Sequence, residues 1–163
     1  MTPMLERWRS ELGGALVELA VALPVLIIVF AGTIDFARVF YTAMNLTNAA
    51  RAGAQYGGHN AAQSGDIATM LTTATSATGL SGVTAVASRT CQCANDTGTF
   101  SPTAPVNDCL SPEAISCPGR HVVITVTVTT STTFNTIMSF GIPGFMRSLS
   151  LSRSATMRVF QQP

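Results

Sequence analysis

The sequence carries little charge, and its positive charge is all of one kind. Only 10% of the 163 residues are charged, against about 25% in an average soluble domain. The nine basic residues are all arginines, and the net charge is +1. Nucleic-acid binding needs clustered positive charge, so the composition gives no support to a nucleic-acid partner. The length suffices for one domain plus a membrane anchor.

Motifs of catalysis and ligand binding are also missing. The sequence has no phosphate-binding glycine loop, no Gly-x-Ser-x-Gly elbow and no paired-carboxylate motif. His59 and His121 have no metal-ligand spacing to another candidate ligand. We therefore expect a protein that is not an enzyme and that has no cofactor, no bound metal and no small-molecule substrate.

The four cysteines gather in one stretch that resembles a loop: Cys91, Cys93, Cys109 and Cys117. An even number of cysteines favours disulfides and hence an oxidising compartment. Zinc knuckles usually hold the metal with a Cys-x-x-Cys chelate, whereas the closest pair here has one residue between its members. Disulfides are therefore preferred over a zinc site. Three pairings are possible, and the sequence does not choose among them.

An apolar run from Leu12 to Ile34 follows a short polar leader, and Glu18 is its one charged residue. As a helix, the run would span about 34 Å at about 1.5 Å per residue, which matches a bilayer core of about 30 Å. Pro24 lies inside it, but membrane helices tolerate proline. The run predicts one membrane-spanning helix.

The helical pattern continues beyond the apolar run. We expect one helix from about Ala15 to Tyr56, ended by Gly57-Gly58. Its first half would lie in lipid, and its alanine-rich second half would pack outside the membrane. Residues at three- and four-residue steps share a face of that half: Phe36, Phe40, Ala43, Thr47, Ala50 and Ala54.

The rest of the chain predicts a small sheet with one short helix. Asp66 can cap a helix over residues 66–77. The other expected elements are a strand over 83–90, a cysteine-bearing loop over 91–119, a strand over 121–133, an apolar connection over 134–147 and a strand over 149–160.

The strand after His121 shows the clearest alternation. Its apolar side should face a core and its threonine side should face water; the apolar side consists of Val122, Ile124, Val126 and Val128. The predicted fold class is α+β. A long N-terminal helix, with a membrane-spanning first half, packs on a small antiparallel sheet that carries a disulfide-bearing loop.

Glu18 is the unusual residue of the apolar run. A carboxylate at mid-membrane costs about 2.5–3.5 kcal/mol on insertion scales. Glu18 therefore either lies near the interface and reaches water, or it pairs with a partner. Its position near the start of the run allows both interpretations.

The residues around Glu18 carry a family resemblance. The segments, in chain order, are Gly13-Gly14-Ala15-Leu16-Val17-Glu18-Leu19, Ala22-Leu23-Pro24-Val25-Leu26, Asp35-Phe36-Ala37-Arg38 and Leu46-Thr47-Asn48-Ala49-Ala50-Arg51-Ala52-Gly53-Ala54. Together they resemble the TadE-like family of minor pilins, or pseudopilins, of the Tad (Flp) type IV pilus system. The late Ala155-Thr156-Met157-Arg158 is also similar. The sequence departs from the family in having Ser10-Glu11-Leu12 where basic residues are common, and Leu19 where an aromatic residue is common.

The resemblance implies a processed membrane protein. A prepilin peptidase would remove residues 1–13 as a leader by cutting between Gly13 and Gly14, which makes Glu18 the fifth mature residue. Residues 14–34 would span the bacterial cytoplasmic membrane once, and residues 35–163 would form an extracytoplasmic pilin-like domain.

The implied function is assembly of an adhesive Tad pilus, into which the protein can be incorporated. The implied partners are the prepilin peptidase, other pilin subunits, the Tad assembly platform and membrane lipid. Glu18 of one subunit could pair with the N-terminal amine of another, and this pairing would set their axial register.

Two other interpretations stay open. The chain could be a secreted, soluble, disulfide-bonded domain whose signal peptide is cut after Ala31. Against this, Glu18 would fall within the signal's apolar region, and the helical pattern continues past Ala31. The chain could also be a one-pass envelope protein unrelated to pili, and an enzyme of that kind lacks its site residues here.

Overall fold

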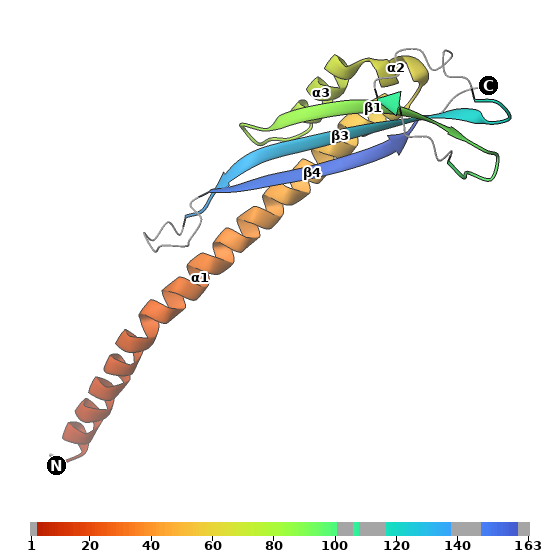
Figure 1. The fold of residues 1–163 in the computed structure, drawn as a ribbon. Coiled ribbons are helices and arrows are strands. Elements are labelled where there is room, and N and C mark those ends of the chain that lie inside the picture. Colours follow the sequence, from red (N-terminus) through yellow and green to blue (C-terminus); the bar gives the residue numbers. More distant parts are fainter. Residues whose placement is uncertain (1–2, 101–105, 108–116, 138–147, 160–163) are drawn as a thin grey trace. The chain divides into compact units, whose positions relative to one another are not determined.

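The structure is a computed structural model that describes residues 3–100, 106–107, 117–137 and 148–159, with the backbone alone for residues 3–13. Its elements, drawn in Figure 1, are α1 (Pro3–Gly58), α2 (Ala61–Gly65), α3 (Ile67–Ser76), β1 (Thr84–Ala94), β2 (Val106–Asn107), β3 (His121–Asn135) and β4 (Ser148–Arg158). The chain divides into two compact units. The helix unit comprises Met1–Val39 and Asn135–Arg147, and the sheet unit comprises Phe40–Phe134 and Ser148–Pro163.

The sheet has the strand order β2-β1-β3-β4. Strands β1 and β3 pair antiparallel from Thr84↔Ser131 to Ala94↔His121. Strand β4 also runs antiparallel to β3. The N–H of Val159 donates to the carbonyl oxygen of Ile124, while the Thr130 hydroxyl reaches the carbonyl oxygen of Arg153, so residue numbers fall along β4 as they rise along β3. The predicted antiparallel pairing of the two long strands is confirmed.

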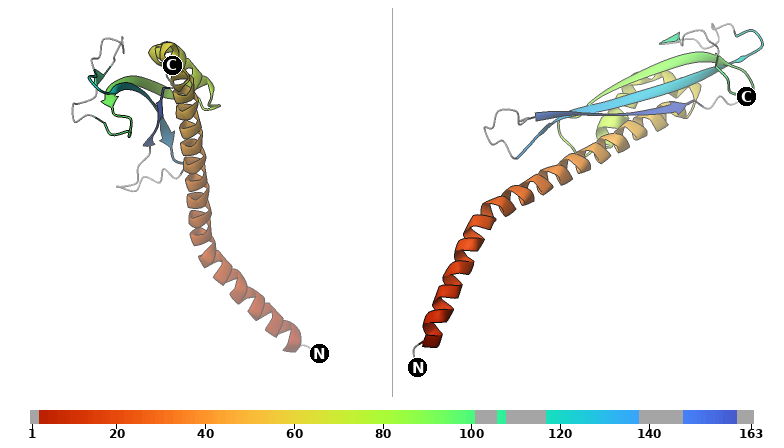
Figure 2. Two further views of the ribbon diagram at one scale, coloured as in Figure 1. Left: turned by 90° about the vertical axis from the view of Figure 1, so that its right-hand side faces the viewer. Right: turned by 60° about the horizontal axis from the view of Figure 1, so that its bottom comes forward.

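One face of the sheet is covered by the last turns of α1 and by α3, which lie on the same side of it in both views of Figure 2. The alternation of β3 explains this, because its apolar side is the buried one. The core cluster consists of Ala54, Met70, Ala74, Cys91, Ile124, Val126, Val128 and Val159. The alanine-rich half of α1 is therefore the cover of the valine face, as the sequence predicts.

Two glycines bring α1 close to its neighbours. A Cβ added at Gly53 would lie 2.9 Å from the carbonyl oxygen of Met70 and 3.2 Å from Cγ1 of Val128. A Cβ added at Gly57 would overlap the sulfur of Met70 and lie 3.0 Å from Cγ1 of Val126. Gly57 therefore does more than end the helix, because its missing side chain makes room for α3 and β3.

The packed face of α1 differs from the predicted one at its start. Phe36 and Phe40 are 67% and 59% exposed, although helical spacing places them in line with the buried Ala50 and Ala54. The buried stripe instead runs along the neighbouring positions Thr42, Leu46, Ala49, Gly53 and Gly57. The glycines of this stripe, Gly53 and Gly57, allow the closest approach of α1 to its neighbours.

The described residues around Cys91 and Cys93 form a strand, although the sequence predicts a loop over 91–119. Strand β1 continues through Cys91 and Cys93 to Ala94 because β3 offers it hydrogen-bonding partners as far as His121. Strand β2 pairs with β1 through Thr90↔Asn107 and Cys91↔Val106. The prediction of an irregular segment is wrong for these residues.

The other boundaries differ less. Helix α1 begins at Pro3 rather than near Ala15, since proline is compatible with a first turn and no glycine precedes Gly13. The cap of α3 is confirmed, because the Asp66 side chain accepts a hydrogen bond from the N–H of Thr69. Helix α2 was not predicted. Part of the expected connection over 134–147 lies outside the described residues.

Candidate functional site

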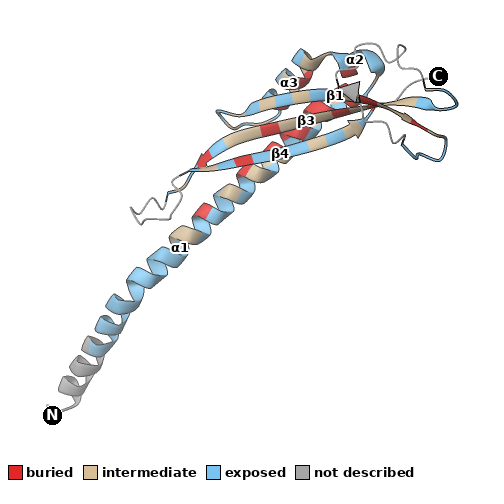
Figure 3. Cartoon of the chain, in the orientation of Figure 1, coloured by how far each residue is buried: buried red, intermediate tan, exposed pale blue. Residues whose placement is uncertain are grey.

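The first half of α1 presents an apolar surface that nothing in the described chain covers. Every residue from Gly14 to Phe30 is exposed, as the pale blue stretch of α1 in Figure 3 shows. The helix is long and apolar enough to cross a membrane, with a mean hydropathy of 2.5 and none of that window buried. Exposed apolar surface on this scale marks contact with lipid or with another protein.

Glu18 lies within this surface and is itself exposed. It sits four residues after Gly14, about 6 Å along the helix axis at about 1.5 Å per residue. Among the described residues, Glu18 has no hydrogen-bond or salt-bridge partner. A Cβ added at Gly14 would meet no atom within 4 Å. Gly13, Gly14 and Glu18 are therefore within two turns of one uncovered helix.

The apolar surface ends at a buried carboxylate. Asp35 is 8% exposed, and its two carboxylate oxygens accept the N–H of Ile137 at 3.1 and 3.0 Å. A guanidinium nitrogen of Arg38 lies 3.1 Å from the same carboxylate. Asp35 thus links α1 to the backbone that follows β3. Its partners, Ile137 and Arg38, both belong to the helix unit.

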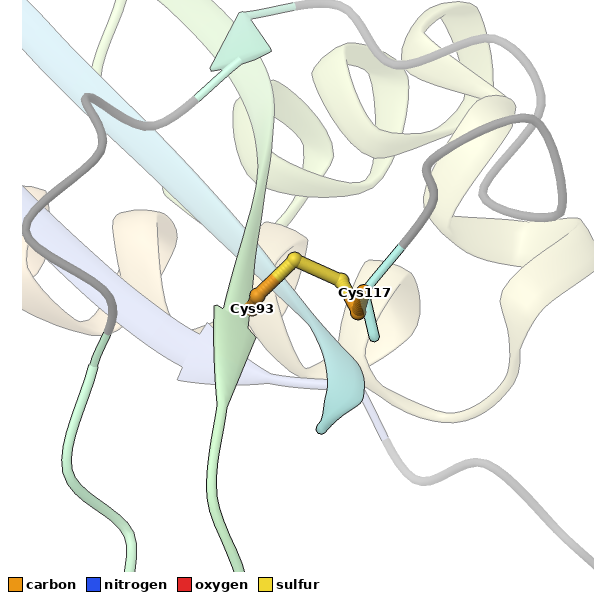
Figure 4. Close-up of a disulfide and its surroundings, with 2 residues drawn as sticks. All are labelled: Cys93 and Cys117. Carbon is orange, nitrogen blue, oxygen red and sulfur yellow. A yellow bond between two sulfur atoms is a disulfide. The ribbon is translucent and has the colours of Figure 1, made fainter. Parts of the chain in front are cut away.

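A disulfide joins Cys93 of β1 to Cys117 (Figure 4), with Cα atoms 5.6 Å apart and a sequence separation of 24. Cys91 is also disulfide-bonded, while Cys109 falls outside the described residues. The preference for disulfides over zinc is therefore confirmed for the Cys93–Cys117 pair. The bond holds the segment that leads into β3 against the end of β1.

The two histidines do not belong to a cluster of titratable side chains in the part of the chain that the structure describes. Nδ1 of His121 lies 3.7 Å from an oxygen of Asp96, and both side chains are exposed. His59 is exposed beside Asn60. Within the described ranges, no three His, Cys, Asp or Glu side chains gather closely enough to hold a metal ion.

Asp66 has a perturbed carboxyl. Hydrogen bonds from the side chain and backbone N–H of Thr69, and a weaker one from the Tyr56 hydroxyl, lower the pKa of Asp66, while burial opposes them. The Tyr56 hydroxyl donates to the carboxylate at 3.1 Å. This contact links α1 to the start of α3. The lowered pKa of Asp66 therefore results from hydrogen bonds that hold the fold together.

Sequence reasoning missed the role of Asp35. The signal was present, because Asp35 and Arg38 stand three residues apart directly after the apolar run, and such pairs meet on a helix surface. The backbone partner, Ile137, stands 102 residues away, and no local pattern predicts that contact.

The comparisons with known proteins agree with the resemblance. The model of one family, described as TadE-like protein, matches residues 13–55. The match begins at the predicted cleavage site, lies wholly within α1, and confirms the suspected family resemblance. No curated protein and no solved structure matches the chain.

Proposed function

We propose that this chain, whose α1 carries the TadE-like sequence, is a minor pilin (pseudopilin) needed to assemble a Tad-type adhesive pilus, and that it has no catalytic activity of its own. One observation carries the proposal. The family match over residues 13–55 coincides with a helix whose large apolar side chains are exposed. A protein that works through such a helix needs lipid before assembly and neighbouring helices after it.

The proposed topology has one membrane crossing. Residues 14–34 span about 31 Å at about 1.5 Å per residue, close to the thickness of a bilayer core. Residues 35–163 lie on the extracytoplasmic side, where the Cys93–Cys117 disulfide is stable. Residues 1–13 form the leader on the cytoplasmic side.

Processing comes next. A prepilin peptidase cuts between Gly13 and Gly14, and the open surroundings of Gly14 support access to this bond. The cut leaves an α-amino group at Gly14, four residues before Glu18 on an apolar helix. The mature chain then meets other pilin subunits and the assembly platform in the membrane.

Glu18 supplies the specificity of assembly. In a bundle of apolar helices, its carboxylate pairs with the α-amino group of a neighbouring subunit, because each charge is otherwise poorly solvated. Breaking a buried ion pair by removing one partner costs about 3–5 kcal/mol. That is more than a hundredfold in an assembly equilibrium.

The test is Glu18→Gln, with Glu11→Gln as its matched control in the leader. We expect Glu18→Gln to be inserted and trimmed but to abolish surface piliation, whereas Glu11→Gln assembles pili normally. Membrane level, intact mass and piliation are measured in the same cells. The mass should correspond to residues 14–163.

Two outcomes would contradict the proposal. Normal piliation with normal trimming of Glu18→Gln would leave Glu18 as a residue that merely reaches the interface. A mature chain that begins at Gly32 would identify a cleaved signal peptide and a secreted domain.

A further inference from the structure

The contact between Asp35 and Ile137 fixes a second segment at one level of α1. Both carboxylate oxygens of Asp35 lie within 3.1 Å of the Ile137 nitrogen, and the Asp35 residue is only 8% exposed. Hydrogen bonds to an ionised carboxylate are stronger than those between neutral groups. The backbone that leaves β3 is therefore held at the height of Asp35 on the helix.

That height is the membrane surface in the proposed topology. Asp35 directly follows the apolar span over 14–34, so it stands where the hydrocarbon core gives way to the headgroups. The charge of Asp35 is matched by Arg38 at 3.1 Å. Pairing makes it less costly for this turn to approach lipid than it would be for an unpaired charge, because the attraction between the two charges offsets part of their loss of hydration.

The side chain held at this height is apolar and exposed. Ile137 is 63% exposed, and the residues on either side of Asp35, Ile34 and Phe36, are 53% and 67% exposed. An exposed isoleucine on a surface loop gains little in water, whereas moving its side chain into an apolar environment is favourable. Ile137, which follows β3, thus adds an exposed apolar side chain beside the outer end of the span.

We propose that Ile137 inserts into the headgroup boundary of the membrane as a second lipid contact, and that Asp35 is the positioning residue that holds it there. The inference rests on the proposed membrane span of α1. We assign lipid as the partner of Ile137 because Ile137 lies at the outer end of the proposed span and extends its exposed apolar surface. The extracytoplasmic domain then has two attachments to the bilayer surface instead of one.

The test places one tryptophan at a time in full-length protein. The background is Trp8→Phe, which removes the native tryptophan. Reporters are Ile137→Trp, Val25→Trp within the span, and Val86→Trp on β1 as a control of similar exposure, at 67%. Each variant is reconstituted at low protein density in phosphatidylcholine–phosphatidylglycerol vesicles, with or without brominated acyl chains that quench indole fluorescence.

We expect quenching and a blue-shifted emission at positions 25 and 137, with weaker quenching at 137 because it lies at a shallower depth, and none at position 86. Adding Asp35→Ala should abolish the quenching at 137 and leave that at 25 unchanged. Asp35→Asn keeps one acceptor oxygen and should restore part of it. Rescue by asparagine separates positioning from a general loss of folding.

The outcomes distinguish the inference from the function on which it rests. Quenching at 25 without quenching at 137 overturns the lipid contact and leaves the membrane anchor standing. Equal quenching at 86 and 137 overturns the specific placement. Unchanged quenching at 137 in Asp35→Ala overturns the role of Asp35. Absence of quenching at 25 overturns the anchor and the inference together.

Discussion

Helix α1 contains two stretches that differ in the size of their side chains and in how far these are buried. Between Gly14 and Phe30 it carries leucine, valine and isoleucine, and every residue is exposed. Between Leu46 and Gly57 it is rich in alanine and glycine, and much of it is buried. Hydropathy alone would assign the core to the first stretch. Burial in the sheet unit instead follows side-chain size, because small residues let the helix lie close to β3 and α3.

The contrast separates two kinds of association within one element. The later stretch packs on α3 and β3 of its own chain, so the size of each side chain is limited by the residues that it contacts. The earlier stretch is exposed, and in the proposed function it contacts lipid or other subunits, which need only a continuous apolar surface. The following changes, from the largest expected effect to the smallest, test where this division holds.

The largest effect is expected from one leucine substitution made in both stretches. Leu46 is fully buried, while Leu26 is 48% exposed. Leu46→Ala should lower the free energy of unfolding of the sheet unit by about 2–5 kcal/mol, the range for a buried leucine that leaves a cavity. Leu26→Ala should leave it unchanged. Amide hydrogen exchange of β3 in detergent measures both, and equal losses would contradict the division.

The second change adds a methyl group instead of removing one. Gly53→Ala places a Cβ 2.9 Å from a backbone oxygen and 3.0 Å from Cβ of Ala74, so α3 has to shift. Overpacking costs about 1–3 kcal/mol, and the better helix propensity of alanine returns about 1 kcal/mol. We expect a net loss of up to about 2 kcal/mol.

Gly14→Ala is the matched control, because an added Cβ meets no atom within 4 Å. It should leave the unfolding of the sheet unit unaffected in the same exchange measurement. A stabilised Gly53→Ala protein would mean that α3 moves freely, and the close approach at Gly53 would then not determine the packing.

Much of this architecture could be predicted because it rests on local patterns. The alternation from Val122 to Val128 predicts the buried face of β3, and Asp66 predicts the start of α3. The Gly57-Gly58 pair predicts the end of α1. Each of these signals acts within a few residues, so a single sequence contains it in full.

The remainder depends on contacts between distant residues. The extension of β1 through Cys93 requires the partner strand β3, and the choice of Cys117 as its disulfide partner requires the folded sheet. Asp35 has the same dependence, because its backbone partner stands 102 residues away. In the candidate site, Gly13, Gly14 and Glu18 stay predictions from the sequence, while the Asp35 contact is seen only in the structure.

A smaller effect is expected at Thr130, where the sheet unit holds α1 by a polar contact. Its hydroxyl is fully buried and donates to the carbonyl oxygen of Leu46 at 2.8 Å. Thr130→Val keeps the shape and removes this bond, which should lower stability by about 1 kcal/mol. Thr129→Val, on the opposite face of β3, is the control and should have no such effect. Equal values in a urea titration would show that the hydroxyl contributes nothing.

The smallest effect concerns the pH dependence of the contact between Tyr56 and Asp66. The pKa of Asp66 is below its ordinary value of 3.8, first through the bonds from Thr69 and last through the Tyr56 hydroxyl. The folded pKa is thus the lower one, so Asp66 stabilises the fold fully above the unfolded pKa, and this contribution is lost as the pH falls through the folded pKa.

Thr69→Ala should raise the pKa of Asp66 more than Tyr56→Phe does. Tyr41→Phe removes the same hydroxyl from a residue that is 61% exposed, and it should leave the carboxyl titration unchanged. A carbon-13 NMR titration of the Asp66 carboxyl ranks the three proteins. If Tyr41→Phe changed the pKa of Asp66 as much as Tyr56→Phe does, the hydrogen bond from the Tyr56 hydroxyl would have no specific effect on Asp66. The part of α1 that packs on its own chain would then end before Tyr56.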